Sequence, residues 1–375
     1  MEPLKNLFSP QLIQWLGFHL EQSLDGFDRK KFETTIIKKL NPLELKQRSQ
    51  LIADEVHEVL PRDCEKRYAI LLNLLHPEIG EGTDQKSDEK GIRGWAILPL
   101  TLVVAQHGLE QFEQSMALLR EMTKRFTSEF AIRYFILHDQ SRALGIMMDW
   151  LDDPSHHVRR LVCEGSRPRL PWAMQLPQLI QHPDPVIPIL TALRDDPSSY
   201  VRRSVANHLN DIAKDHPDRV AELAINWMKD ADANREKLVR HGCRTLIKQG
   251  HELALSAFGI MRPKIKPLVI EVTPSTIAFG TSFTIRADII STTSKPQRLV
   301  VDYCLHFKKA NGNLSAKTFK GSQLSLKGND ALTFTKTHTI KAITTRRYYP
   351  GKQGVSLRIN GEDFGFTEFL LTMKK

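Results

Sequence analysis

The chain has 375 residues, which is enough to bury a large core and, by ordinary domain sizes, to form two domains. Its cysteines form no CxxC pair and no cluster with histidine at zinc-ligand spacing, which excludes a structural zinc site and favours a reducing compartment. No basic region followed by an apolar core opens the chain, and the longest apolar run, residues 95–105, is too short to span a bilayer. We therefore expect a cytoplasmic protein without a membrane segment.

The positive charge is concentrated at one end of the chain. The net charge is +10, and residues 263–375 hold 18 Lys and Arg against 7 Asp and Glu, whereas residues 1–262 hold 35 against 36. A basic segment of this kind favours a polyanionic partner, and nucleic acid is the leading candidate inside a cell. The alternative is a surface that is basic only for solubility.

The first 262 residues are predicted to be helical, because apolar residues recur three and four positions apart between Pro, Gly and Asp-rich corners. Within them LDDPSHHVRRLVCEGS (151–166) and RDDPSSYVRRSVANHL (194–209) match with an offset of 43 residues, and residues 229–246 hold a weaker copy. A period near 40 is typical of stacked HEAT-like helix pairs. We expect Asp-Pro-Ser to cap and start the second helix of each pair.

After residue 262 the pattern changes to alternating apolar and polar residues rich in Val, Ile, Thr and Phe, as in SFTIRADII and QRLVVDYCLHF. About seven such strands predict an immunoglobulin-like sandwich without the Cys, Trp and Cys core of antibody domains. The sequence thus predicts a mainly α protein. A HEAT-like helical repeat solenoid over residues 1–262 is followed by a smaller all-β sandwich over residues 263–375, with PKIKP (263–267) as the linker.

The repeated helices are predicted to present charged side chains on one exposed ridge. On a helical wheel Arg203, Asn207 and Asp211 fall on one face, and Arg160 and Glu164 fall at equivalent places with Arg167 beyond them. The alternative is an ordinary solvated face, with Arg160 and Glu164 as a surface ion pair. The acids among the cations indicate a function beyond phosphate binding alone, because a carboxylate weakens binding to a polyanion unless it meets a positive charge.

Three long strings, TSEFAIRYF (127–135), CEGSRPRLPWA (163–173) and SSYVRRSVANHLNDIAKDHPD (198–218), resemble the AlkC branch of the AlkC/AlkD family of alkylpurine DNA glycosylases. The resemblance covers most of the helical body, and the sandwich resembles the extra domain of many AlkC members. At Tyr134 the chain departs from the proline that we expect in this family.

The resemblance implies a DNA glycosylase of base excision repair that hydrolyses the N-glycosidic bond of cationic N3-methylated bases, 3-methyladenine and 3-methylcytosine, without flipping the base. It implies catalytic roles for Glu129, Glu164 and Asp211, and an aromatic contact from Trp172 to the lesion or its deoxyribose. Glu129 could instead pair with Arg133 on a helix surface, and Trp172 could be a core anchor. We expect a monofunctional enzyme, since the motifs place no lysine where a Schiff-base lyase needs one.

The DNA contacts that we expect are cations from both parts of the chain: Arg160, Arg167, Arg169, Arg203, Lys237, Arg240, Arg346 and Arg347. Each could instead be an ordinary surface cation. The histidines lack an i,i+4 pair or an HExxH string, so we expect no metal, and we expect no cofactor. The partner is then double-stranded DNA with methylated bases, bound by a monomer. The alternatives are a non-catalytic scaffold that binds damaged DNA and a protein-interaction solenoid.

Overall fold

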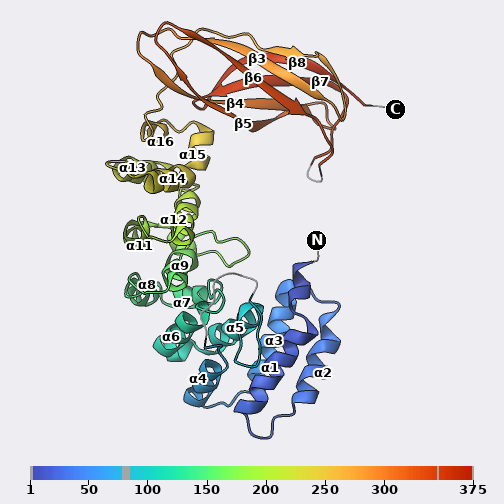
Figure 1. Cartoon of the computed structure of the whole chain (residues 1–375), viewed down its shortest axis with the longest axis vertical. Helices are drawn as coiled ribbons and strands as arrows, with labels where there is room; N and C mark the ends of the chain where they lie inside the picture. Colours follow the sequence, from blue (N-terminus) through green and yellow to red (C-terminus); the bar gives the residue numbers. More distant parts are fainter. Residues whose placement is uncertain (1–2, 78–84, 344–345, 374–375) are drawn as a thin grey trace. The chain divides into compact units, whose positions relative to one another are not determined.

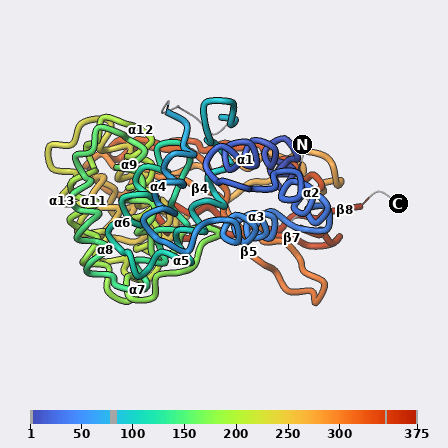
Figure 2. Tube along the Cα trace, turned by 90° about the horizontal axis from the view of Figure 1, so that it is seen from below, coloured from blue at the N-terminus to red at the C-terminus, as the bar shows by residue number. Residues whose placement is uncertain are grey.

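The computed structural model describes residues 3–77, 85–343 and 346–373, and the chain divides into two compact units, Met1–Asp215 and His216–Lys375. The first unit is helical. Its α-helices are α1 (Pro10–Ser23), α2 (Arg29–Leu40), α3 (Leu45–Val59), α4 (Cys64–Asn73), α5 (Ile97–His107), α6 (Phe112–Thr123), α7 (Ile132–His138), α8 (Gln140–Met148), α9 (His156–Gly165), α10 (Pro177–Gln181), α11 (Ile187–Leu193) and α12 (Ser199–Ile212). Helices α1, α2 and α3 form one group, joined to the rest through the contact of α3 with α5 (Figure 2).

The repeated strings form the helices α9 and α12, which lie side by side with α11 packed against both (Figure 1). Val158, Leu161, Val201 and Val205 are fully buried between these helices, as the period of the sequence predicts. The helical-repeat architecture of the first unit is therefore the predicted one.

The Asp-Pro-Ser corners stabilise the repeats in a way that the sequence did not predict. Ser155 and Ser198 occupy the N-cap positions, but neither side chain accepts a capping bond. Instead Asp153 Oδ1 accepts the Ser155 amide and Asp196 Oδ1 accepts the Ser198 amide, each at 2.8 Å. The expectation that the Asp-Pro-Ser side chains cap the first turn is thus wrong for the serines, and the first aspartate tightens the corner before the helix begins.

Each of these aspartates also receives an arginine from the preceding repeat. Arg120 Nε donates to Asp153 at 2.8 Å, and Arg159 donates to Asp196 from Nε at 2.6 Å and from Nη2 at 3.0 Å. Both aspartates are buried. The arginine and aspartate pairs form a ladder that fixes the register between successive repeats.

We expect Asp153→Asn to lower the free energy of unfolding by about 2 kcal/mol, because the neutral amide loses charge-assisted bonds from Arg120 in a buried place. Chemical denaturation followed by circular dichroism measures this. Asp152 is the adjacent exposed carboxylate, so Asp152→Asn is the matched control and should change stability by less than about 0.5 kcal/mol. Equal effects of the two substitutions would contradict the ladder.

The second unit contains α13 (Pro217–Trp227), α14 (Ala233–Gly242), α15 (Arg244–Gln249), α16 (Glu252–Ser256) and a two-sheet sandwich. One sheet has the order β1 (Glu271–Thr273), β3 (Ser282–Ile290), β6 (Ala331–Thr339). The other has the order β2 (Thr276–Ala278), β8 (Glu362–Thr372), β7 (Gly351–Ile359), β4 (Gln297–Lys308), β5 (Leu314–Leu326). Inward residues such as Phe283, Ile285, Val301, Leu305 and Leu357 fill the core, as the alternating pattern predicts.

The change from helix to strand falls between Ser256 and Glu271, and the predicted boundary at residue 262 lies in this segment. The compact units divide earlier, at Asp215 and His216, so that α13 to α16 belong to the same unit as the sandwich. The division into domains 1–262 and 263–375 therefore stays a prediction. Among the helices that the structure describes, none is both long and apolar enough to cross a membrane.

Candidate active site

Three carboxylates from separate segments of the first unit gather in one cluster. Glu129 lies in the turn between α6 and α7, Glu164 is near the C-terminal end of α9, and Asp211 is near the C-terminal end of α12. These are the three acids to which the family resemblance assigns catalysis. The structure therefore brings the predicted carboxylates into one neighbourhood, although 82 residues separate the first from the last.

Glu129 is held by its own turn and by α9. Thr127 Oγ1 donates to Glu129 Oε2 at 2.9 Å and accepts the Glu129 amide at 3.1 Å, and Arg160 Nη1 donates to the same carboxylate at 2.7 Å. The Arg160 guanidinium stacks on the Tyr200 ring at 4.5 Å from the centroid. Burial alone would lower the pKa of Arg160, but the carboxylates of Glu129 and Glu164 outweigh it and raise that pKa. Arg160 therefore stays charged.

Arg167 joins the other two acids. Its Nη1 lies 2.6 Å from Glu164 Oε1 and its Nε lies 2.8 Å from Asp211 Oδ2. Ser204 Oγ donates to the second oxygen of Glu164, and Lys214 Nζ lies 3.1 Å from Asp211 Oδ1. Burial opposes the charge of Arg167, yet the two carboxylates raise its pKa overall. Glu164, Arg167 and Asp211 thus form one buried ionic chain.

The predicted exposed ridge is wrong for these residues. Glu164, Arg167 and Asp211 are 5%, 6% and 3% exposed, so they are not members of a solvated helix face. Arg160 does approach Glu164, at 3.6 Å, but the two side chains are only 16% and 7% exposed, so this is not a surface pair. The helical wheel failed because the segment after α9 inserts Arg167 between the two helices, which a wheel drawn for each helix alone cannot show.

Arg133 stabilises the segment that carries Arg167. It is fully buried, and it donates to the carbonyl oxygens of Met174, Gly165 and Arg167 at 2.7, 2.8 and 2.7 Å. Burial and the neighbouring Arg167 lower its pKa to about 10, against the attraction of the three acids. The alternative of a surface pair between Arg133 and Glu129 is therefore wrong. Arg133, Arg160 and Arg167 supply three positive charges to a cluster with three negative ones.

Trp172 lies on this segment and projects outward. The residue is 63% exposed and its backbone has φ of 67°, a strained value for a residue with a side chain. Lys46 of α3 donates to the Trp172 carbonyl. The alternative of a core anchor is wrong, because an anchor would be buried. An exposed aromatic ring held on a strained, tethered backbone is suited to contact a partner.

A cavity of about 750 Å³ opens beside the cluster. Glu129, Glu164, Arg167 and Trp172 line it, together with Tyr134 at the position where the family resemblance leads us to expect proline. Glu129 and Arg160 also line a neighbouring cavity of about 350 Å³ with His156, His157 and Tyr200. Glu129 and Glu164 are therefore accessible from these cavities, whereas Asp211 lines neither of the two.

The sequence analysis missed several members of this cluster. Tyr200 and Ser204 lie one turn apart on α12, on the face that continues to Asp211, a signal that the wheel contained. Lys214 stands inside the string used for the resemblance and pairs with Asp211, and the expectation that no lysine lies where a Schiff-base lyase needs one stays a prediction. Lys46 lies more than 120 residues from Trp172 in the chain, and no local pattern points to it.

The other predicted DNA-binding cations differ in their surroundings. Arg169 makes a two-bond pair with Asp215 at 2.8 and 2.9 Å, whereas Arg203 is exposed on α12. In the second unit Lys237 is exposed, and Arg240 pairs with Glu236 and stacks on Phe258. There too Arg346 stacks on Phe307 at 4.2 Å and Arg347 lies over Tyr349 at 5.6 Å. Their contacts with DNA stay predictions.

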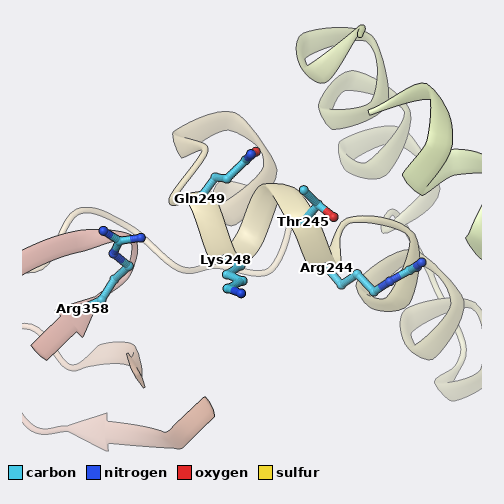
Figure 3. Close-up of a pocket in the computed structure, with 5 residues that line it drawn as sticks. All are labelled: Arg244, Thr245, Lys248, Gln249 and Arg358. Atoms are coloured by element: carbon cyan, nitrogen blue, oxygen red, sulfur yellow. The ribbon is translucent and has the colours of Figure 1, made fainter. Parts of the chain in front are cut away.

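The second unit also has a basic hollow that the sequence analysis did not single out. Arg244, Lys248 and neighbouring residues of α15 line a cavity of about 530 Å³ together with Arg358 of β7 (Figure 3). The backbone of the turn after α15 contacts the backbone of the turn after β7. The approach is so close that a Cβ added to Gly361 would lie 1.8 Å from the Cα of Gly250. Only glycine permits this approach, which fixes the short helix against the sheet.

His208 of α12 lies next to the acid cluster, and its burial leads us to expect that stability depends on pH. It is fully buried, and its Nδ1 lies 3.0 Å from the Cys163 carbonyl, to which it donates. Burial first, and Arg167 second, lower its pKa to about 3 from an unfolded value near 6.5. Between these values the unfolded chain binds a proton that the folded chain does not, so stability falls as the pH falls from about 6.5.

His208→Asn should remove part of this acid sensitivity, since an asparagine amide can donate to the same carbonyl without titrating. The slope of unfolding free energy against pH should become shallower by up to about 1.4 kcal/mol per pH unit between pH 6 and pH 4. Above pH 7 the two slopes should agree. Urea unfolding at each pH measures this, and parallel slopes throughout would contradict it.

Comparison with known proteins agrees with this architecture. Residues 268–373 match the family model described as the C-terminal Ig-like domain of the uncharacterised protein YhaZ, which confirms the predicted sandwich. Uncharacterized protein YhaZ of Bacillus subtilis (strain 168) is 34% identical over 364 residues, covering 96% of this chain and 97% of that protein.

A solved structure extends the likeness to the helical unit. The Pseudomonas fluorescens alkylpurine DNA glycosylase AlkC, bound to DNA containing an abasic site analog, is 36% identical with a TM-score of 0.84, covering 99% of this chain and all of that one. The predicted resemblance and the predicted fold class are confirmed. The chain belongs to the AlkC family of alkylpurine DNA glycosylases.

Proposed function

We propose that this protein is a monofunctional DNA glycosylase that removes 3-methyladenine and 3-methylcytosine from duplex DNA in base excision repair. The observation that carries the proposal is the gathering of Glu129, Glu164 and Asp211 beside the exposed ring of Trp172, in a chain that is similar throughout its length to AlkC. We further propose that it acts as a monomer on DNA in the bacterial cytosol.

The chemistry that this cluster suits is hydrolysis of a weakened glycosidic bond. A methylated cationic base leaves with both electrons of the bond between C1′ and nitrogen and becomes neutral, so no protein acid is needed. The deoxyribose then gains oxocarbenium character, which nearby carboxylates stabilise. The oxygen of a water molecule bonds to C1′ and its proton passes to a carboxylate acting as general base.

Two members of the cluster have the access that this step requires. Glu129 and Glu164 both line the cavity bordered by Trp172, whereas Asp211 reaches the cluster through Arg167. We assign the contact with the sugar to Glu129 and Glu164. We assign the orientation of the attacking water to Glu164 and Asp211, the two acids that Arg167 joins. Trp172 would place an aromatic face against the cationic lesion, which favours binding by a cation–π contact. In this arrangement the base stays stacked and the enzyme approaches from the sugar.

One observation favours the alternative of a non-catalytic DNA-binding scaffold. Each of the three carboxylates is already paired with an arginine, and buried ion pairs often serve structure alone. Catalysis requires that the cationic sugar compete for these carboxylates at the moment of bond cleavage. The two functions therefore differ in whether free base is produced, not in whether DNA is bound.

The test is incubation of the purified chain with methylated duplex DNA, with mass spectrometry of the released bases. We expect free 3-methyladenine and 3-methylcytosine, and an abasic strand that breaks only on alkali treatment. Borohydride trapping should give no covalent complex, although Lys214 and Lys46 lie near the cluster. Binding without release would favour the scaffold, and a trapped complex would contradict hydrolysis by water alone.

A further inference from the structure

The position of the Trp172 ring depends on how its strained backbone is held. The residue is exposed, so no core packing fixes the ring. A φ of 67° costs free energy in a residue with a side chain, and such a conformation persists only where the surrounding structure imposes it. The bonds to this part of the backbone therefore decide where the ring lies.

The segment around Trp172 is attached from two directions. From the interior, Arg133 donates to the carbonyl oxygens of Arg167 and Met174, which lie before and after the tryptophan. From helix α3, Lys46 Nζ donates to the carbonyl oxygen of Trp172 itself. Arg133 thus holds the neighbours of the strained residue, whereas Lys46 bonds to it directly.

Helix α3 is a firm support for this lysine, because it is fixed in its first turns. Arg48 is 7% exposed and donates to the carbonyl oxygens of Leu43 and Lys5 at 3.0 and 2.9 Å. Gln50 exchanges two amide bonds with Gln106 of α5, at 3.0 and 2.9 Å. A lysine on a loose helix would move together with the tryptophan, whereas a lysine on a fixed helix restrains it.

The charge of Lys46 is unsuited to direct contact with the proposed substrate. Lys46 and Trp172 line the same cavity as Glu129 and Glu164. A cationic base, and a sugar that gains positive charge as its bond breaks, are both repelled by an ammonium group at this cavity. A charged donor does, however, make a stronger bond to a carbonyl oxygen than a neutral one. The bond to Trp172 therefore explains the lysine better than contact with the lesion does.

Resting on the proposed function, we propose that Lys46 is a positioning residue, which holds the Trp172 backbone so that the ring lies against the damaged nucleotide. It acts through Trp172 and touches neither the base nor the sugar. A displacement of about 1 Å at an active site can slow catalysis by about 100-fold, so loss of this bond has a measurable effect on rate. Its effect on overall stability is small, because Lys46 is exposed and Arg133 still holds the segment.

A double-mutant cycle tests whether Lys46 acts through Trp172. Lys46→Met should slow single-turnover release of 3-methyladenine at saturating enzyme by about tenfold, with duplex affinity and the midpoint of thermal unfolding unchanged. In a Trp172→Ala protein, which is itself slow, the same substitution should change release by less than about twofold. Lys46→Arg keeps a charged donor and should restore release to within about threefold of the unmodified rate. The matched control is Lys38→Met, at an exposed lysine of α2, which should change neither quantity.

Equal slowing by Lys46→Met with and without the Trp172 ring overturns the proposal. If duplex affinity also falls in both backgrounds, Lys46 contacts a phosphate of the DNA instead. Unmodified release by Lys46→Met, or by Trp172→Ala alone, overturns the positioning role and leaves the proposed glycosylase function intact. Release of no base by the unmodified chain overturns the proposed function and, with it, the role of Lys46.

Discussion

Glu164→Gln should reduce the rate of base release by at least about 100-fold while duplex affinity stays within a few-fold of the unmodified protein. The amide keeps the shape of the side chain and can still contact Arg167 and Ser204. It loses the negative charge that the developing sugar cation needs. Single-turnover release and fluorescence anisotropy with the same duplex measure the two quantities.

The matched control is Glu113→Gln, an exposed glutamate that pairs with Arg142 on the surface. It should release base at the unmodified rate. Asp211→Asn should also abolish release while DNA binding is kept, through its place beside Arg167. Unmodified turnover in both Glu164→Gln and Asp211→Asn would refute the roles assigned to these acids.

Arg133→Met should be damaging in two measurable ways. It leaves three carbonyl oxygens, two of them buried, without this donor, so the free energy of unfolding should fall by about 3 kcal/mol or more. The segment with Arg167 and Trp172 loses its attachment, and a displacement of about 1 Å at the cluster can slow catalysis by about 100-fold. Thermal unfolding and single-turnover release at a temperature where both proteins are folded separate these effects.

Arg133→Lys distinguishes a positioning role from a requirement for charge. Lysine keeps the positive charge, but its single nitrogen cannot reproduce the planar fork that reaches Gly165, Arg167 and Met174 together. We expect intermediate stability and a rate still well below that of the unmodified protein. Arg142→Met, at an exposed arginine of the next helix, is the control and should change neither. A folded Arg133→Met protein with unmodified release would contradict the positioning role.

The sequence predicted the parts of the fold that depend on periodic patterns. The two strings that match with an offset of 43 residues predicted α9 and α12, and the alternating segments predicted the sandwich. Burial of one face of a helix or strand makes its apolar residues recur at a fixed spacing. The described residues form eight strands, against the about seven that we expected. The three acids followed from the family strings and not from any pattern of charge.

The parts that the sequence could not predict involve backbone atoms and distant segments. Nothing in the sequence shows that Arg133 bonds to backbone carbonyl oxygens. Every residue has such a carbonyl, and the sequence does not distinguish the ones that accept a bond. The burial of Glu164 depends on the course of the segment after α9, which contains no periodic pattern. Lys46 joins the site from α3, which ends at Val59, 68 residues before the first catalytic string begins at Thr127, through tertiary packing alone.

The pairing of Arg120 with Asp153 and of Arg159 with Asp196 has a consequence for how this architecture can grow. Each arginine belongs to one repeat and reaches the corner of the next, so the repeat with Asp153 and Arg159 carries both members of the pairing. A tandem duplication of this repeat would bring with it the aspartate that binds the preceding repeat and the arginine that binds the following one. The solenoid could thus lengthen during evolution without any new complementary surface having to arise.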